Sequence, residues 1–310
     1  MKFAFVFPGQ GSQSVGMMAA YGDSPVIRAT FDEASLALGR DLWQLVVEGP
    51  AEALSQTVNT QPLMLTAGIA VWRLWQERNG PAPAMLAGHS LGEYAALVAA
   101  GALDLKTAVP LVELRAKAMQ EAVPAGTGAM AAILNLDPEK IKAICVEQAQ
   151  GEAVQAVNFN SPEQTVIAGH KAAVERAAEA CKAAGAKRAV MLPVSAPFHS
   201  SLMQPAAERL RAALAGIEFR MPAIPVVNNV DVVVAADPVA IKEALVRQAA
   251  APVRWVETLR AMQAAGVTHV FECGPGKVLA GLTKRCAELA GGAMNDLAGV
   301  EATLAAVKGQ

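Results

Sequence analysis

The residues best suited to chemistry in this sequence form the motif Gly88-His89-Ser90-Leu91-Gly92. A short apolar run precedes the motif and a helix-favouring run follows it, which is the strand, tight turn and helix context of a nucleophile elbow. Glycine at both ends lets strand and helix approach closely while Ser90 holds a strained conformation with an exposed hydroxyl. The Leu91 amide, at the start of the helix, is then free to donate to an oxyanion. We predict a nucleophile at Ser90; the alternative is an ordinary strand-to-helix turn.

A glycine-rich turn at residues 8–14 follows a predicted buried strand at residues 3–7. Turns in this position of α/β proteins often bind ligands. A dinucleotide loop would require glycine at position 14, which is Ser14, and no Gly-Lys-Ser/Thr follows for a phosphate loop. Two interpretations remain: a backbone amide near Gln10 approaches a ligand, or the segment is an ordinary turn.

Arg115 occupies an awkward position for a folded helix. Asp104 is a good N-cap for a helix from residue 105 to about residue 123, and Arg115 lies on its apolar stripe. Glu113 and Lys117 pair on another face, so Arg115 has no carboxylate partner on its own helix. Because a buried, unpaired guanidinium is strongly unfavourable, Arg115 must extend to solvent, meet a distant acid or bind an anionic ligand.

A serine nucleophile needs a general base, and the chain has four histidines. His89 would point away from the nucleophile on its strand, and His170 begins a helix and is expected to be exposed. His269 lies inside a predicted strand, where a core histidine is the default. His199 lies in a loop that two prolines stiffen, at a junction between structural units. We therefore predict that His199 is the base.

The frame around these residues is predicted from periodicity and turn residues. Strands and helices in the order β-α-β-β-α-β, typical of a ferredoxin-like unit, are expected at residues 128–134, 138–150, 153–159, 164–169, 171–184 and 187–192. We expect an α/β fold: a hydrolase-like large domain with a parallel central sheet, residues 1–125 and 195–310, and an inserted ferredoxin-like subdomain, residues 126–194. A helix break is expected at Pro62 and a loosely packed tail at residues 291–310.

Composition excludes several classes of function. The 310 residues carry a formal net charge of −2 without a basic block, which argues against nucleic-acid binding. No apolar run is long enough to span a membrane, and the opening run ends at Pro8, too early for a signal peptide, so we expect a cytoplasmic protein. The four cysteines are far apart and lack a Cys-x-x-Cys, so neither a metal site nor a disulfide framework is predicted.

Taken together, these residues make the chain resemble the malonyl-CoA:acyl carrier protein transacylases of bacterial fatty acid synthesis, over nearly its full length. The resemblance rests on several motifs in order, namely residues 7–13, 88–94, 115, 158–162, 199, 247–248 and 252–255. The activity that it implies is ping-pong transfer of malonyl from malonyl-CoA to the phosphopantetheine thiol of holo acyl carrier protein, without a metal or cofactor. We expect a monomer.

The resemblance also implies roles for individual residues. Ser90 would carry the acyl group, His199 would be the base, and Arg115 would hold the malonyl carboxylate. Amides of Gln10 and Leu91 would form the oxyanion hole.

In this family a main-chain carbonyl, here that of Gln248, replaces an acid in orienting the histidine. The substrate-binding positions implied are Gln61, Asn158, Asn160, Lys187 and Arg188. The last four would approach the pantetheine or phosphates of the thioester donor. From the residues alone, the turn at 158–162 could equally do no more than close a hairpin, and Lys187 and Arg188 could be a solvated edge.

Three alternatives stay open. A phenylalanine directly before the histidine, here Phe198, resembles the pattern in malonyl-selective acyltransferase domains of polyketide synthases. A trans-acting polyketide-type malonyl acyltransferase is therefore the first alternative. An α/β-hydrolase esterase is the second, with Ser90, Asp231 or Asp237, and His269 in that fold's chain order. The third is a non-catalytic module that binds coenzyme A or a carrier protein.

Overall fold

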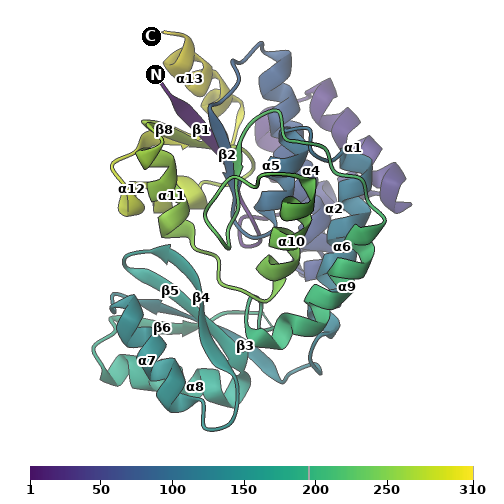
Figure 1. Ribbon diagram of the computed structural model, residues 1–310. Coiled ribbons are helices and arrows are strands. Elements are labelled where there is room, and N and C mark those ends of the chain that lie inside the picture. Colours follow the sequence, from purple (N-terminus) through teal and green to yellow (C-terminus); the bar gives the residue numbers. More distant parts are fainter. Residues whose placement is uncertain (195, 310) are drawn as a thin grey trace.

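The computed structural model describes residues 1–194 and 196–309, and these form two sheets of different kinds (Figure 1). The expected second segment of the large domain begins at Ser195 and ends at Gln310, both outside the described residues. The larger sheet has the order β7-β2-β1-β8-β9 and is parallel throughout. Its strands are β1 Phe3–Phe7, β2 Met85–Gly88, β7 Val226–Val227, β8 His269–Glu272 and β9 Ala290–Ala293.

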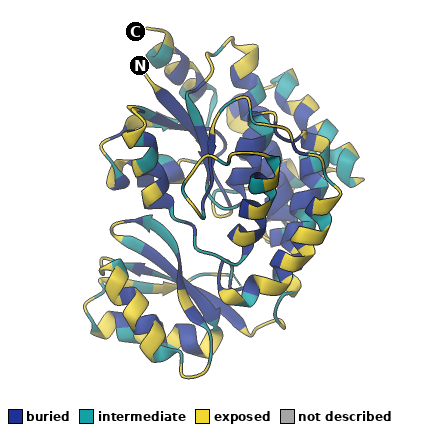
Figure 2. Ribbon diagram, in the orientation of Figure 1, coloured by how far each residue is buried: buried dark blue, intermediate teal, exposed yellow. Residues whose placement is uncertain are grey.

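Strand β1 shows why this sheet is buried between two layers of helices. Alternate side chains of a strand point to opposite faces. Phe5 packs edge-on against Trp75 on one face, with ring centroids 5.0 Å apart, whereas Ala4 and Val6 belong to the cluster on the other face. All five residues of the strand are buried, which Figure 2 shows as a dark central ribbon. The predicted parallel central sheet is therefore confirmed.

Helices cover both faces of this sheet. One face is covered by α1 Pro25–Leu38, α2 Leu42–Glu48, α3 Ala51–Leu54, α4 Thr57–Glu77, α5 Gly92–Ala99, α6 Leu105–Glu121, α9 Gln204–Ala215, α10 Pro238–Ala249 and α13 Leu297–Lys308. The opposite face is covered by α11 Trp255–Ala264 and α12 Val278–Cys286. Among the described residues, no helix combines the length and apolar composition that crossing a bilayer requires.

The smaller sheet is antiparallel and has the order β4-β5-β3-β6. Its elements are β3 Gly128–Leu134, α7 Pro138–Gln148, β4 Val154–Ser161, β5 Gln164–His170, α8 Lys171–Ala183 and β6 Arg188–Met191. Both helices pack on one face, and Figure 1 shows this unit beneath the large sheet. The predicted β-α-β-β-α-β unit is confirmed, with strand ends that differ from the expected ones by one or two residues.

The open face of the small sheet points toward the large unit. Met130, Val157 and Val166 on this face pack with three side chains of the connection to the large unit, namely Leu192, Val194 and Phe198. Strand β4 also pairs with the large unit through main-chain bonds: the Phe159 amide donates to the Val253 carbonyl at 3.0 Å, and the Val253 amide donates to the Val157 carbonyl at 2.8 Å. These features support our proposal that residues 126–194 are a subdomain inserted into the larger one.

The expected helix break at Pro62 is wrong. Pro62 lies inside helix α4. A proline cannot donate to the carbonyl four residues earlier, which here is that of Val58. The Arg40 guanidinium donates to that carbonyl at 3.2 Å, so a side chain from outside the helix replaces the missing bond.

The expected loose tail at residues 291–310 is also wrong over the part that the structure describes. This part forms β9 at the edge of the parallel sheet and then α13. Met294 and Val300 are fully buried, and the Tyr21 hydroxyl donates to the Met294 carbonyl at 2.8 Å. Small residues suit this position because a Cβ at Gly291 would lie 1.8 Å from the Val270 carbonyl oxygen.

Candidate active site

The nucleophile elbow predicted around Ser90 is present in the fold. Strand β2 ends at Gly88, helix α5 begins at Gly92, and Ser90 between them has φ +52°, a strained value for a residue with a Cβ. Both glycines are required by close backbone approach. A Cβ at Gly88 would lie 1.8 Å from the Gly92 carbonyl carbon, and one at Gly92 would lie 2.0 Å from the Phe7 carbonyl oxygen.

His199 contacts the serine hydroxyl directly. Its Nε2 lies 2.7 Å from Ser90 Oγ, and its Nδ1 lies 2.8 Å from the main-chain oxygen of Gln248. A carbonyl can only accept, so Nδ1 carries the proton and Nε2 accepts from the hydroxyl. Burial, with a further contribution from the positive charge of Arg115, lowers the pKa of His199 to about 3. The imidazole is therefore neutral and able to take a proton.

Arg115 is 2% exposed and lies in the same site. Its Nη1 donates to Gln61 Oε1 at 2.7 Å, and its Nη2 donates to Ser90 Oγ at 3.0 Å and to Gln248 Oε1 at 2.9 Å. The guanidinium also lies over the Tyr94 ring, 5.4 Å from its centroid. Of the three possibilities predicted from sequence, extension to solvent is excluded.

A distant acid is present in the form of Glu93. Gln248 links it to Arg115, because Gln248 Nε2 donates to Glu93 Oε2 at 2.8 Å while its Oε1 accepts from Arg115. The Arg115 Nε is buried and has no hydrogen-bond partner among the described residues. A buried guanidinium whose Nη2 contacts a reactive hydroxyl is suited to an anionic ligand, so the two remaining possibilities are compatible.

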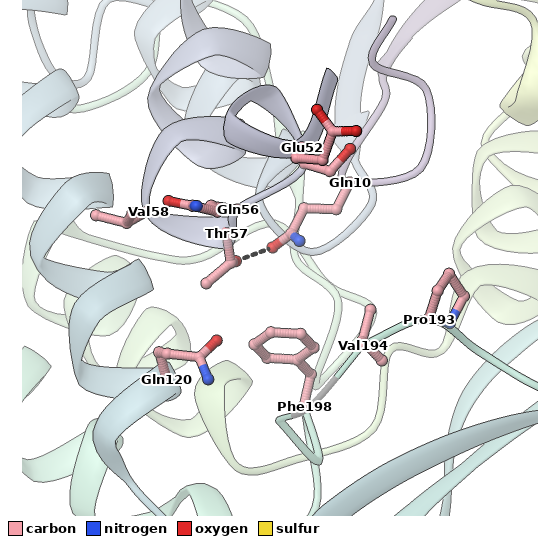
Figure 3. Close-up of a pocket in the computed structure, with 10 residues that line it drawn as sticks. Gln10, Glu52, Gln56, Thr57, Val58, Gln120, Pro193, Val194 and Phe198 are labelled. Atoms are coloured by element: carbon pink, nitrogen blue, oxygen red, sulfur yellow. Dashed lines mark hydrogen bonds between the residues drawn. The ribbon is translucent and has the colours of Figure 1, made fainter. Parts of the chain in front are cut away.

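The Gln10 loop borders the same cavity. The Gln10 side chain accepts from Thr57 Oγ1 at 2.5 Å and from Gln61 Nε2 at 3.3 Å, and Figure 3 shows the first of these bonds. These contacts fix the loop through its side chain. Within the described residues the main-chain amides of Gln10 and Leu91 donate to no protein acceptor, as expected of donors that face a ligand.

A cavity of about 400 Å³ contains these groups, and Ser90, Arg115 and His199 are among its lining residues. A neighbouring hollow of about 430 Å³ shares part of that lining, including Gln10 and Phe198. Figure 3 shows the Phe198 ring at this hollow, between Val194 and Gln120. Phe198, the residue before the predicted base, therefore borders both spaces, which are of a size suited to a small acyl group and its carrier arm.

The other predicted substrate-binding residues fall into two groups. Asn158 lines the cavity, with a buried Oδ1 that has no partner among the described residues, whereas Asn160 Oδ1 lies 2.7 Å from His89 Nε2. Lys187 and Arg188 are exposed at strand β6 and are not among the residues that line the cavity.

The remaining histidines have structural contacts. His89 bonds to Asn160 and lies against the Trp255 ring, with centroids 5.4 Å apart, and burial lowers its pKa. His170 is half-buried rather than exposed, because its Nδ1 accepts from the Ala153 amide at 2.9 Å. His269 Nδ1 contacts the Thr268 hydroxyl.

The alternative Ser-Asp-His set is not assembled around Ser90. Asp231 binds Arg247 through both carboxylate oxygens at 2.6 Å, and Asp237 caps helix α10. Among the described residues, no group of three or more His, Cys, Asp or Glu side chains could hold a metal ion. The four cysteines are free and buried.

Sequence reasoning missed two residues that contact the site. Asn229 Oδ1 accepts from the Ser90 amide, and its Nδ2 donates to the Gly88 carbonyl, both at 2.8 Å. Glu93 accepts from the Asn229 amide at 2.9 Å. A charged residue beside a glycine in an otherwise apolar helix start was a usable signal for Glu93. Nothing near Asn229 in the chain points to its role.

Comparison with known proteins agrees with this geometry. A family model described as an acyl transferase domain matches residues 4–300. The malonyl CoA-acyl carrier protein transacylase of Escherichia coli strain K12 is 58% identical over 305 residues, 98% of this chain and 99% of the relative. An acyl-carrier-protein S-malonyltransferase from Burkholderia pseudomallei 1710b superposes with a TM-score of 0.97 at 59% identity, covering 98% of this chain and 99% of its own.

A malonyl-transacylase solved in complex with a type II polyketide synthase acyl carrier protein is similarly close. Its TM-score is 0.97 at 57% identity, and the match covers 98% of this chain and 99% of that chain. The likeness therefore extends over nearly the whole chain.

Proposed function

The chain belongs to the acyl transferase domain family, and we propose that it transfers a malonyl group from malonyl-CoA to the phosphopantetheine thiol of holo acyl carrier protein. The reaction follows a ping-pong course through a malonyl ester of Ser90 and supplies fatty acid synthesis. One observation carries the proposal: a single chain of contacts joins the Ser90 hydroxyl to His199 and His199 to the Gln248 carbonyl, beside a buried guanidinium.

In the first half-reaction, Ser90 Oγ attacks the thioester carbonyl while His199 Nε2 takes the hydroxyl proton. The amides of Gln10 and Leu91 stabilise the oxyanion of the tetrahedral intermediate. When the intermediate collapses, the carbon–sulfur bond breaks and the proton on His199 goes to the thiolate of coenzyme A. A carbonyl at Nδ1, in place of a carboxylate, orients the imidazole without adding a charge.

In the second half-reaction, the carrier-protein thiol gives its proton to His199 and attacks the ester. Collapse of the second intermediate returns the proton to Ser90 and releases malonyl thioester. Protein side chains and amides perform every step. Arg115 binds the free carboxylate of the malonyl group, which is supported by its burial, its place in the lining of the cavity and the 3.0 Å between its Nη2 and Ser90 Oγ.

Binding of the thioester arm is assigned to residues beside and beyond the cavity. Asn158, which lines the cavity, is suited to an amide of pantetheine, and the exposed Lys187 and Arg188 are suited to the phosphates of coenzyme A. Asn160, whose side chain bonds to His89 and Gln164, supports the site from the same strand. Gln61 acts through Arg115, to which its side chain is bonded. We propose that the protein works as a cytoplasmic monomer.

The test is covalent labelling. Incubation with radiolabelled malonyl-CoA alone should give a burst of label on Ser90, and addition of holo acyl carrier protein should move that label to the carrier. Release of label only as free malonate would support an esterase instead. Absence of any covalent label, with retained binding of coenzyme A, would support a non-catalytic binding module.

The choice of carrier defines a second candidate function. The similar malonyl-transacylase bound to a polyketide carrier protein, together with Phe198 beside the base, favours a trans-acting polyketide role. Competition between a fatty acid carrier protein and a polyketide carrier protein for the malonylated enzyme separates the two. A kcat/KM at least tenfold higher for the polyketide carrier, about 1.4 kcal/mol, would favour this second function.

A further inference from the structure

Glu93 is a buried carboxylate that the reaction described above does not use. It lies in the first turn of helix α5, directly after the elbow, and is 2% exposed. Its Oε2 accepts from two donors, the Asn229 amide at 2.9 Å and Gln248 Nε2 at 2.8 Å. Among the described residues it forms no direct ion pair. A carboxylate in such a position needs a reason, since burial of a charge is costly.

Both residues that donate to Glu93 also form hydrogen bonds to the proposed nucleophile or the proposed base. Asn229 brackets the strained turn, because its side chain accepts from the Ser90 amide and donates to the Gly88 carbonyl. Gln248 Nε2 also donates to the Ser90 carbonyl at 3.0 Å, and the Gln248 main-chain oxygen accepts from His199. The peptide groups on both sides of Ser90 and the partner of His199 are therefore tied to one carboxylate.

These groups come from separate parts of the chain. Ser90 belongs to the β2–α5 turn, Asn229 follows β7, and Gln248 lies at the end of α10. The turn bonds directly to both segments, to Asn229 through the Ser90 amide and to Gln248 through the Ser90 carbonyl. Glu93 adds a second bond to each segment, and because both bonds go to one carboxylate oxygen they also fix Asn229 and Gln248 relative to each other.

We propose that Glu93 is a positioning residue for acyl transfer, which holds Ser90 and His199 in register through Asn229 and Gln248 and balances the charge of Arg115. The proposal rests on the proposed function. His199 has no carboxylate partner of its own. Under the proposal Glu93 takes that part indirectly, because it contacts Gln248, whose carbonyl contacts the imidazole. In the free protein it is also the negative charge nearest Arg115 in the hydrogen-bond network.

Glu93→Gln is the informative variant because it keeps the size of the side chain and one acceptor oxygen but removes the charge, so both bonds to Oε2 lose their charge assistance and hold Asn229 and Gln248 more weakly. Glu272→Gln is a matched control. Glu272 is also fully buried, accepts from the Ala280 amide at the start of α12, and has a pKa that burial raises to about 7, as burial does for Glu93. Among the described residues, its side chain accepts hydrogen bonds only from the start of α12, away from the elbow and His199.

The first measurement is inactivation of Ser90 by phenylmethanesulfonyl fluoride. This uncharged reagent tests nucleophile and base without recognition of malonyl or coenzyme A. Misplacement of reacting groups by about an ångström can reduce rates by about 100-fold, so we expect Glu93→Gln to slow inactivation by about tenfold or more. Glu272→Gln should lower the melting temperature and leave the inactivation rate unchanged. A wild-type inactivation rate in Glu93→Gln would overturn the positioning role.

The second measurement is calorimetric binding of free malonate at about pH 8.5, above the pKa of about 7 to which burial raises Glu93, so that the wild-type carboxylate is ionised. Loss of the Glu93 charge leaves Arg115 uncompensated, so malonate should bind more tightly to Glu93→Gln than to wild type, although the variant reacts more slowly. Equal or weaker binding would refute the charge-balancing part. A purely structural defect would weaken both properties together, and that outcome would also overturn the proposal.

Glu93→Asp provides the test if Glu93→Gln fails to fold. It keeps the charge and withdraws the carboxylate by one methylene, so inactivation should slow while malonate affinity stays at the wild-type value. Unchanged inactivation in this variant would contradict the proposal. Failure of the proposed function can be told apart from failure of this proposal. In that case the wild-type enzyme would transfer no malonyl group, whereas the Glu93 variants would still be inactivated more slowly than wild type.

Discussion

Arg115 Nη2 lies 3.0 Å from Ser90 Oγ, so the group proposed to bind the substrate carboxylate is in hydrogen-bond contact with the proposed nucleophile. Both are enclosed in one cavity with His199. A malonyl group is short, and its carboxylate is separated from the reacting carbonyl by one methylene. The short distance between Arg115 and Ser90 matches that separation, which makes the selectivity for malonyl a testable property of this pair.

Arg115→Ala should remove that selectivity. In wild type an acetyl donor leaves the guanidinium buried and without a carboxylate, a penalty of about 3–5 kcal/mol, so malonyl should be preferred by roughly 100-fold or more. The variant should lose most malonyl transfer and lose acetyl transfer much less. Lysine at this position should rescue only partly, because an ammonium cannot form the planar two-bond fork. The measurement is the ratio of kcat/KM for malonyl-CoA to that for acetyl-CoA; an unchanged ratio would show that the carboxylate is read elsewhere.

Ser90→Ala should abolish both acyl transfer and covalent labelling by malonyl-CoA, because the attacking oxygen is gone. The fold should persist, since the change removes one hydroxyl from a turn that Asn229 holds through the main-chain amide. Circular dichroism and melting temperature provide the control. Recovery of labelled protein from this variant would refute the assignment of the nucleophile.

His199→Ala should reduce the rate of acylation by roughly 100-fold or more, because the hydroxyl loses its proton acceptor. His269→Ala is the matched control. His269 is half-buried in β8 and stacks near Phe271 with centroids 6.2 Å apart, so its loss should affect melting temperature more than rate. Single-turnover kinetics with malonyl-CoA measure both; a larger rate defect in His269→Ala would favour the esterase alternative.

His199 should also make the fold less stable in mild acid. Its pKa is about 3 in the folded protein and 6.5 as the reference for the unfolded chain. The unfolded chain therefore binds more protons below pH 6.5, so stability falls as the pH drops from 6.5 toward 3. At pH 5 the contribution is about 2 kcal/mol. Urea unfolding of wild type and His199→Gln at pH 7.5 and pH 5 measures it: the wild type should lose more stability between the two values, and equal losses would contradict the lowered pKa.

Helix α13 should contribute to stability although the sequence suggested a loose tail. Leu304 is 7% exposed within the cluster that covers the large sheet, so Leu304→Ala should destabilise the protein by about 2 kcal/mol or more. Leu36→Ala in α1 is the control, since Leu36 is 85% exposed and its truncation should change stability by less than about 0.5 kcal/mol. Chemical denaturation compares the two, and equal effects would show that α13 is not packed as described.

The sequence by itself determined the elements whose signals are local. The continuous apolar run of β1, the Asp104 cap of α6 and the elbow glycines depend on neighbours in the chain, and each lies where it was predicted. The β-α-β-β-α-β order could likewise be predicted, because each of its elements has its own periodicity. Ser90 could be predicted as the nucleophile because the strained turn itself requires the motif.

Only the tertiary structure decided which distant groups meet. The Ser90 amide contacts a side chain 139 positions later, Asn229, and Glu93 contacts Gln248 across 155 positions. No pattern in either segment encodes such a pair, because each bond depends on where β7 and α10 pack against α5. The prediction of a loose tail was wrong for the same reason. Small residues at 290–293 suggest a loosely packed segment when read alone, but in the fold they allow close backbone approach to the neighbouring strand β8.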